Sequence, residues 1–307
     1  MRNPLPDGCG VALVTPFDSD GQLDRPALRT LVDYVIDGGC SFIVALGTTG
    51  EAVSQSRAEC IEVLKLVHEY ADRRVPLVAG PFGGNGTDGV LQRFRDYAEV
   101  FELPGYVALM SSVPSYVKPN QEGIYAHFMR LAEEAPLPIL LYNVPSRTGK
   151  HMTAATTVRL ARASEVFIGV KEASGVMTEG MAIFRDAPSG FKLYSGDDTT
   201  ALPLMACGAN GVVSVVANAY PRVFSDMTRA ALAGEFAKAR RGNDALLDMH
   251  EWLYVDGNPA GIKAVLAQLD LCGDTVRLPL APVSDATRGK LVDEVMRMET
   301  VVAPGVA

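Results

Sequence analysis

The sequence predicts an α/β fold: a (β/α)8 TIM barrel with an appended C-terminal helical region. Eight short apolar runs begin near residues 10, 41, 75, 106, 138, 166, 191 and 211. Stretches with helical periodicity separate them, so that the repeat is about 20 to 34 residues long. After the eighth run, roughly 90 residues remain, and they have helical patterns. Eight consecutive strand–helix units are typical of the barrel, whereas a doubly wound sheet, the alternative, seldom needs as many.

In the first half of the chain, strands are expected over residues 10–17, 41–47, 75–80 and 106–110. Asp24 can cap the first helix, with Pro26 in its first turn. The apolar stripe of that helix comprises Leu28, Leu31, Val32 and Val35. A second helix is expected from Arg57 to Ala71, and a glycine-rich turn at 83–87 leads into the third.

In the second half, strands are expected over 138–142, 166–171, 191–195 and 211–216, and helices near 121–134, 153–163, 176–186 and 198–207. A later helix should start at Asn258 and Pro259, with asparagine as the cap and proline in the first position. We therefore predict a barrel over residues 1–225 and a C-terminal helical region over 226–307. That region exceeds what barrel closure requires, which suggests a subunit interface or a cap over one end.

The composition narrows the class of protein. A net charge of −8 and a pI near 5.1 argue against nucleic acid or an anionic membrane as a partner. Five widely spaced cysteines without a Cys-x-x-Cys pair indicate reduced thiols. The first residues lack the apolar core of a signal peptide, and no apolar run reaches the roughly 18 residues of a membrane span. We expect a soluble, cytoplasmic protein.

The sixth predicted strand ends in a lysine, Lys171, which barrel geometry would place at the mouth of the lumen. Strand alternation assigns Val166, Ile168 and Val170 to the covering helices, and Phe167, Gly169 and Lys171 to the lumen. Gly169 should leave an empty slot beneath the lysine. Two interpretations are open: an ion pair with Glu172 or another carboxylate that serves only structure, or a desolvated, neutral amine that forms a Schiff base with a carbonyl substrate.

Two further loops at the same barrel end carry polar groups. Gly-Thr-Thr-Gly-Glu at 47–51 offers hydroxyls and backbone N–H groups suited to a carboxylate, although Thr49 could simply cap a helix. After the fifth strand, Tyr142 and Arg147 offer an acid/base group and a carboxylate clamp. The alternatives are a core aromatic and a solvated charge.

Other motifs are weaker. The glycines at 83–86 lack the Lys-Ser/Thr of a P-loop. Asp197 and Asp198 are expected to cap the following helix rather than to bind a metal. The four histidines lack metal-ligand spacing, and we interpret His68 and His127, inside helices, as structural. The sequence therefore predicts no metal and no cofactor.

The motifs at 47–51, 142–149, 169–174 and 195–198 follow the order and spacing of the dihydrodipicolinate synthase/N-acetylneuraminate lyase family. The resemblance covers about residues 8 to 295 and implies a pyruvate-dependent class I aldolase, usually a homotetramer. It implies these roles: Lys171 as the Schiff-base lysine, Tyr142 beside it, Thr48 and Thr49 at the pyruvate carboxylate and in the proton relay, Tyr116 as a relay tyrosine that crosses into a neighbouring subunit's site, and Val213 as a backbone contact near the substrate.

Within that family, the Tyr-Asn-Val-Pro-Ser-Arg-Thr-Gly sequence resembles the synthase branch, in which the arginine, here Arg147, holds the carboxylate of aspartate semialdehyde. The loop before Tyr116 is longer than the family pattern, and Ser115 replaces the first of two adjacent tyrosines. The positions that match the lysine-feedback pocket are Ala52, Arg57, Cys60, Gly89 and Ser115, and only Asn85 remains of its usual polar and aromatic set.

The resemblance implies a lyase, most closely a 4-hydroxy-tetrahydrodipicolinate synthase that condenses pyruvate with aspartate semialdehyde. One alternative keeps the Schiff base but takes a different partner, as in an aldolase, lyase or dehydratase acting on a 2-keto-3-deoxy sugar acid. Another is a barrel that binds a small carboxylate without turnover. The combination of Lys171, Tyr142, Thr49 and Tyr116 favours catalysis over binding alone.

Overall fold

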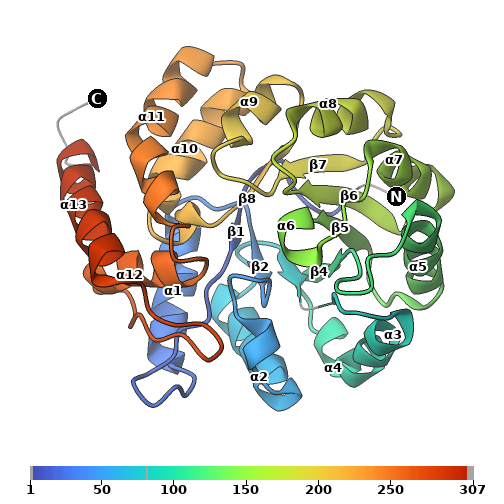
Figure 1. Cartoon of the computed structure of the whole chain (residues 1–307), viewed down its shortest axis with the longest axis horizontal. Coiled ribbons are helices and arrows are strands. Elements are labelled where there is room, and N and C mark those ends of the chain that lie inside the picture. Colours follow the sequence, from blue (N-terminus) through green and yellow to red (C-terminus); the bar gives the residue numbers. More distant parts are fainter. Residues whose placement is uncertain (1–2, 81, 303–307) are drawn as a thin grey trace.

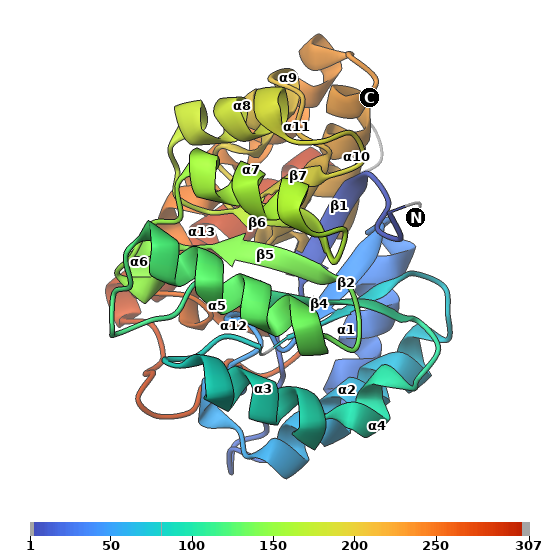
Figure 2. The same cartoon turned by 90° about the vertical axis from the view of Figure 1, so that its right-hand side faces the viewer.

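The computed structural model describes residues 3–80 and 82–302 (Figure 1). In this part of the chain, eight parallel strands pair in sequence order, and the eighth pairs with the first to close a barrel. Helices surround the strands, and α3, α5, α7 and α8 lie side by side on the outside (Figure 2). The predicted (β/α)8 barrel with additional C-terminal helices is confirmed.

The strands are β1 (Gly8–Ala12), β2 (Phe42–Ala45), β3 (Leu77–Ala79), β4 (Tyr106–Ser112), β5 (Ile139–Asn143), β6 (Phe167–Glu172), β7 (Lys192–Ser195) and β8 (Gly211–Ser214). The helices that follow β1 to β7 are α1 (Arg25–Asp37), α2 (Arg57–Ala71), α3 (Thr87–Asp96), α4 (Ala98–Phe101), α5 (Gln121–Glu134), α6 (Pro145–Thr148), α7 (Ala154–Ala163), α8 (Met177–Asp186) and α9 (Ala201–Ala206), with the short 3-10 helix η1 at Ala52–Ser54. After β8 come η2 (Val216–Asn218), α10 (Pro221–Leu232), α11 (Phe236–Trp252), α12 (Ala260–Gln268) and α13 (Asp285–Val302).

Several strands are shorter than the apolar runs predicted, and the early ends of β1 and β8 have identifiable causes. β1 ends at Ala12 instead of residue 17, and the run beyond it contains Pro16, which has no N–H to donate to a neighbouring strand. β8 ends at Ser214, because the next two backbone N–H groups, of Val215 and Val216, donate to the carboxylate of Asp198. A buried apolar run therefore marks a strand without fixing its end.

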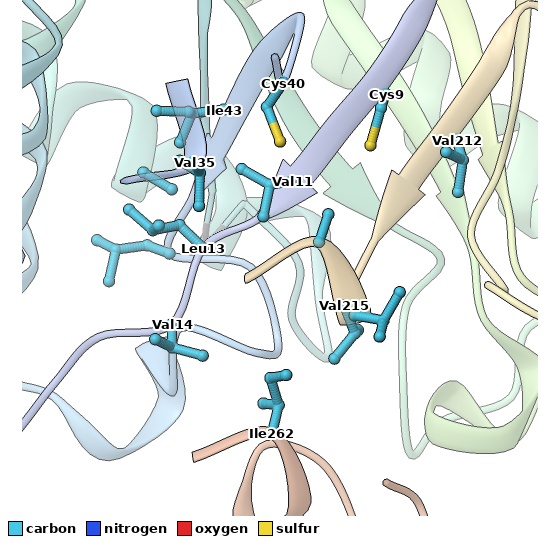
Figure 3. Packing of buried hydrophobic residues seen from close by; sticks show 14 of the residues in the cluster. Cys9, Val11, Leu13, Val14, Val35, Cys40, Ile43, Val212, Val215 and Ile262 are labelled. Atoms are coloured by element: carbon cyan, nitrogen blue, oxygen red, sulfur yellow. The ribbon is translucent and has the colours of Figure 1, made fainter. Parts of the chain in front are cut away.

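Apolar side chains form two layers on either side of the strands. The outer layer fills the space between strands and helices; in Figure 3, Val11 and Ile43 from neighbouring strands lie near Val35 of α1. The inner layer fills the lumen, where the rings of Phe42 and Tyr194 meet edge to face with centroids 5.3 Å apart. The barrel is thus a packed core, and only its ends offer room for a ligand.

The predicted alternation along β6 is wrong for its first residues. Phe167 packs in the outer layer and Ile168 in the lumen, the reverse of the expectation. The cause is a register shift: Ile139 of β5 pairs with Phe167, but Leu140 pairs with Gly169, which leaves one extra residue in β6. Beyond this bulge the predicted order returns, and Val170 lies in the outer layer.

The capping predictions had mixed outcomes. The Asp24 side chain accepts a hydrogen bond from the N–H of Ala27, so the cap of α1 is confirmed. Asp198 does not cap α9, since its carboxylate binds the backbone at the start of η2 instead. Asn258 does not cap α12, because its side chain turns toward the barrel. Both side chains bind groups that are distant in the sequence.

The C-terminal helices lie along one side of the barrel in Figure 1, from α10 in orange to α13 in red. The predicted boundary at 225/226 falls within α10, and the division into two units stays a prediction. Ile262 of α12 points toward the barrel near Val14 and Val215, so α12 packs against the segments that follow β1 and β8 (Figure 3). Among the described residues, no helix is both long and apolar enough to cross a membrane.

Candidate active site

Lys171 lies at the carboxyl end of β6 and pairs in register with Tyr142 of β5 on one side and Tyr194 of β7 on the other. Its side chain is only 4 % exposed. The Nζ atom lies 4.7 Å from the centroid of the Tyr142 ring, a distance at which an amine contacts the ring face. The structure therefore brings together the predicted lysine and the predicted tyrosine beside it.

The ion-pair interpretation of Lys171 is wrong within the part of the chain that the structure describes. The neighbouring carboxylate, Glu172, accepts hydrogen bonds from Asn143 Nδ2 at 2.8 Å and from the Ser174 N–H at 2.7 Å. Burial raises the pKa of Glu172, and these hydrogen bonds oppose the shift. Adjacent residues of a strand point to opposite faces, which explains why Glu172 turns away from the amine. Lys171 is left without a carboxylate partner among the described residues.

Gly196, directly after β7, forms the wall against which the lysine stem packs. A Cβ at this position would lie 3.0 Å from both Cγ and Cε of Lys171 and 2.6 Å from Cβ of Ala173. Beneath the lysine, Gly169 does not leave the empty slot that we expected. A Cβ there would lie 2.5 Å from the Lys192 carbonyl oxygen, so the glycine permits close approach of the β7 backbone.

The loop after β2 carries Thr48 and Thr49 and is anchored by Glu51. Glu51 adopts a left-handed conformation (φ 52°), and its carboxylate accepts a hydrogen bond from Nζ of Lys263 in α12. Both side chains are fully buried, and burial lowers the pKa of Lys263 while Glu51 opposes that shift. The side chain of Thr49 accepts a hydrogen bond from Asn258 Nδ2 at 3.0 Å. The cap role considered for Thr49 is not observed, since η1 begins after Glu51.

A cavity of about 440 Å³ opens beside these loops and is lined by Thr48, Tyr142 and Arg147, among others. Tyr142 connects Lys171 with this cavity, because its ring contacts the amine and the residue is also part of the lining. The charged side chains of the described lining, Arg93 and Arg147, are both cationic. Such a lining suits substrates that carry carboxylates.

Arg147 lies in α6, and its Nη2 donates a 3.4 Å hydrogen bond to the backbone carbonyl of Asn258. The neighbouring Thr148 hydroxyl donates to backbone carbonyls of its own loop, including that of Lys150 at 2.9 Å. The loop therefore has internal hydrogen bonds that do not involve the guanidinium. Arg147 remains exposed at the mouth, where a carboxylate could reach it.

The two remaining predicted residues lie in different surroundings. Val213 of β8 is fully buried in the lumen layer, as a residue that contributes only its backbone to a site could be. Tyr116 is 86 % exposed, in a loop where it has a φ of 63°. A side chain this exposed contributes little to this chain's own core, and its predicted role in a neighbouring subunit stays a prediction.

Sequence reasoning missed Asn258 and Lys263 as part of the site. Asn-Pro commonly begins a helix, so Asn258 had the pattern of a cap, and Lys263 carried no signal of its own. Each contacts the loop after β2 from more than 200 positions away along the chain. Gly196 lies inside a recognised motif, but only the structure shows that it packs against Lys171.

Comparison with known proteins gives a consistent result. A sequence model of the Dihydrodipicolinate synthetase family matches residues 6–298. The 4-hydroxy-tetrahydrodipicolinate synthase of Parabacteroides distasonis is 44 % identical over 96 % of this chain and 97 % of its own length, and that of Azobacteroides pseudotrichonymphae is 41 % identical over 98 % and 100 %. A chloride-inhibited dihydrodipicolinate synthase from Acinetobacter baumannii, solved in complex with pyruvate, superposes with a TM-score of 0.90 at 36 % identity, covering 95 % of this chain and 98 % of that one.

Proposed function

The chain belongs to the dihydrodipicolinate synthetase family, and we propose that it condenses pyruvate with aspartate semialdehyde through a Schiff base on Lys171. The expected family and its synthase branch are confirmed by relatives that are 41–44 % identical over nearly the whole chain. It is accordingly a lyase of the class I aldolase type, a 4-hydroxy-tetrahydrodipicolinate synthase of the lysine biosynthetic route. The roles of individual residues are our proposal.

The observation that carries the proposal is the environment of Lys171. Its amine is buried at the barrel mouth, lies over the Tyr142 ring and has no carboxylate partner in the described part of the chain. Such an amine can act as a nucleophile toward a ketone. It attacks the carbonyl carbon of pyruvate, and loss of water leaves a protonated imine.

The imine nitrogen, once protonated, makes the pyruvate methyl group acidic. Tyr142, Thr49 and Tyr116 move the protons of imine formation and of methyl deprotonation, which gives an enamine. Thr48 and Thr49 bind the pyruvate carboxylate through hydroxyl and backbone N–H groups, and Val213 contributes a backbone contact. The protonated imine on Lys171 accepts the electron pair that is left when the methyl group loses its proton. The proposal therefore calls for neither a metal nor a cofactor.

The enamine carbon then forms a bond to the aldehyde carbon of the second substrate, whose carboxylate is held by Arg147. The aldehyde oxygen takes up a proton and becomes a hydroxyl group. The amino group of the former semialdehyde attacks the imine carbon and displaces Lys171, which returns as a free amine. The product is cyclic 4-hydroxy-tetrahydrodipicolinate.

A direct turnover assay tests this function. The purified protein is given pyruvate with aspartate semialdehyde and, separately, a panel of 2-keto-3-deoxy sugar acids. We expect condensation with the semialdehyde and little or no cleavage of the sugar acids. Preferential turnover of a sugar acid would reject the synthase assignment while leaving the Schiff-base chemistry in place.

We also propose that the protein is a homotetramer in which Tyr116 completes the site of a neighbouring subunit. Its high exposure, together with that of Val117 and Val53, supports a surface that is covered by another copy. Mixing Tyr116→Phe with Lys171→Arg subunits tests this: restored activity in mixed assemblies is expected. If no activity returns although mixed oligomers form, Tyr116 does not act across an interface.

A cytoplasmic location is proposed on the strength of the cysteines, all five of which are free thiols. Free thiols are typical of reducing compartments. Fractionation of cells that produce the tagged protein would test it: recovery with the cytoplasmic fraction is expected, and recovery from an oxidising compartment would contradict the proposal.

A further inference from the structure

The two strands that carry Lys171 and Tyr142 are joined by a second side-chain contact on their other face. β5 and β6 lie side by side (Figure 2), with Tyr142 in register with Lys171 and Asn143 in register with Glu172. Successive side chains of a strand point to opposite faces, so Asn143 and Glu172 lie behind the reactive pair. Asn143 Nδ2 donates to Glu172 Oε2 at 2.8 Å, and the two residues are only 0 % and 4 % exposed.

Hydrogen bonds to the backbone fix the direction of this contact. Glu172 Oε1 accepts from the Ser174 N–H at 2.7 Å, so both oxygens of the carboxylate act as acceptors. Asn143 Oδ1 accepts from the Met152 N–H at 3.0 Å, which turns the amide nitrogen toward Glu172 and toward Nδ1 of His151, 3.1 Å away. A flip of this amide would point its NH₂ group at the Met152 N–H. The asparagine is therefore the donor and the glutamate the acceptor.

The register of β5 against β6 is not uniform, so a contact that selects one register has a function. Near the start of the two strands, one extra residue in β6 shifts their pairing. Backbone hydrogen bonds of a parallel pair are evenly spaced and do not by themselves distinguish one register from the next. A slip of one residue would turn Lys171 from the lumen to the helix-covered face. The Asn143–Glu172 bond forms in the register that places Lys171 beside Tyr142, and a slip would break it.

We propose that Asn143 and Glu172 are positioning residues, whose buried hydrogen bond sets the register of β5 and β6 and thereby holds the Lys171 amine against the Tyr142 ring. This inference rests on the proposed function, in which Lys171 forms the Schiff base. Each of the two residues acts through the catalytic residue that precedes it in its strand.

Glu172→Gln tests the proposal, because it keeps the shape and removes one acceptor. The single glutamine oxygen can accept from Ser174 or from Asn143, and the NH₂ group then faces the other donor. A buried donor without an acceptor is costly, so the strands should shift. A misplacement of about 1 Å can cost on the order of 100-fold in rate. At saturating pyruvate we expect borohydride trapping per folded protein to slow by about tenfold or more. The pyruvate concentration that gives half the maximal rate should change little, because the loop after β2 is untouched.

Addition of Asn143→Asp to Glu172→Gln reverses donor and acceptor and should restore the rate. The glutamine oxygen then accepts from the Ser174 N–H, and the glutamine nitrogen donates to the new carboxylate. That carboxylate also accepts from the Met152 N–H, so all three hydrogen bonds return. We expect trapping to recover to within about threefold of the wild-type rate, since the two changes compensate only in combination.

Asn210→Asp, added to Glu172→Gln instead, is the matched control. The Asn210 side chain likewise accepts from a backbone N–H, that of Leu193 at 3.0 Å, and donates to a carboxylate, that of Asp7 at 3.1 Å. It lies at the opposite end of the barrel, before β8. This double variant has the same composition and charge as the reversed pair, but it should trap pyruvate no faster than Glu172→Gln alone.

The pH profile of trapping separates positioning from an electrostatic effect of the lost charge. The titratable groups beside the pair are His151 and, 3.4 Å beyond it, Glu179 of α8. If Glu172 positions Lys171, the limiting rate at high pH falls in Glu172→Gln. An unchanged limiting rate with a profile displaced along the pH axis would overturn the proposal, because the charge rather than the register would then act on the amine.

Two further results would overturn it: a wild-type trapping rate in Glu172→Gln, or no recovery in the reversed pair although that variant folds. If Glu172→Gln does not fold, Glu172→Asp takes its place, since it keeps the charge and withdraws the carboxylate by one methylene group. A loss of about tenfold is expected there, and an unchanged rate would reject the positioning role. Failure of the proposed function is recognised separately, because the wild-type protein would then form no adduct on Lys171.

Discussion

Gly196→Ala should disable Lys171 although it replaces no ionisable residue. The added methyl group would lie 3.0 Å from both Cγ and Cε of Lys171 and 2.6 Å from Cβ of Ala173. Non-bonded carbon atoms prefer separations of about 3.5–4.0 Å. The lysine stem must therefore move by roughly 0.5–1 Å. The shorter contact, with Cβ of Ala173, must be relieved by a shift of the backbone, since Ala173 has no flexible side-chain atoms.

The expected magnitudes derive from that displacement. Overpacking of this kind costs about 1–3 kcal/mol of the free energy of unfolding, which should lower the melting temperature by a few degrees. A misplacement of about 1 Å in a reacting group can cost on the order of 100-fold in rate. We therefore expect the rate of pyruvate trapping by borohydride to fall by about 100-fold, a larger effect than the modest loss of stability explains.

Two glycine variants serve as controls, with trapping followed by intact-mass spectrometry. In Gly180→Ala the new methyl group would lie 2.5 Å from Leu204 Cδ1, a similarly short contact but with the flexible end of a side chain, where α8 meets α9. Gly289→Ala in α13 places its methyl group in open space. Both should trap pyruvate at the wild-type rate. Unimpaired trapping by Gly196→Ala, or equal impairment of Gly180→Ala, would refute the reasoning.

Three further outcomes are expected. Arg147→Ala should weaken use of the aldehyde substrate by roughly 30-fold or more while pyruvate trapping survives, because losing a charged partner of a carboxylate costs about 2–5 kcal/mol; equal loss of both activities in a destabilised variant would reject the clamp. Millimolar L-lysine should leave the activity nearly unchanged, since Ala52 and Gly89 lack the polar groups of a feedback pocket, and saturable inhibition would contradict this. Burial lowers the pKa of His127 from 6.5 to about 4, so below pH 6.5 the unfolded chain binds a proton that the folded chain does not. The free energy of unfolding should then fall by up to about 3 kcal/mol as the pH drops from 6.5 to 4, and urea midpoints should show that His127→Gln reduces this dependence; an unchanged dependence would assign it to other groups.

The fold could be predicted because its signals are local. Each strand is a short apolar run, and the caps and glycines between runs lie within a few residues of the helices that they delimit. The predictions that were wrong concern positions whose conformation depends on a segment that is distant in the sequence. The bulge in β6 depends on how Ile139 and Leu140 pair with it, and strict alternation along β6 cannot reveal that. Likewise, the Asp198 side chain does not cap α9, because its carboxylate accepts hydrogen bonds from two backbone N–H groups after β8.

The core of the site could also be predicted, because parallel strands deliver their carboxyl ends to one edge of the barrel. Lys171 and Tyr142 end neighbouring strands, and the structure places the lysine amine over the tyrosine ring. The supporting contacts could not be predicted. Asn258 reaches Thr49 across 209 positions, and nothing near it in the sequence distinguishes it from an ordinary helix cap. Its role depends on where α12 packs, which only tertiary structure shows.

The central claim is that Lys171 forms the Schiff base, and peptide mapping after reduction tests it most directly. The protein is incubated with pyruvate and borohydride, digested, and the modified residue is located by mass spectrometry. We predict one pyruvyl unit per chain, on Lys171, and none in Lys171→Arg. Lys263 provides an internal comparison, since it is also buried but is paired with Glu51. Absence of an adduct, or an adduct on Lys263 or any other lysine, would contradict the account.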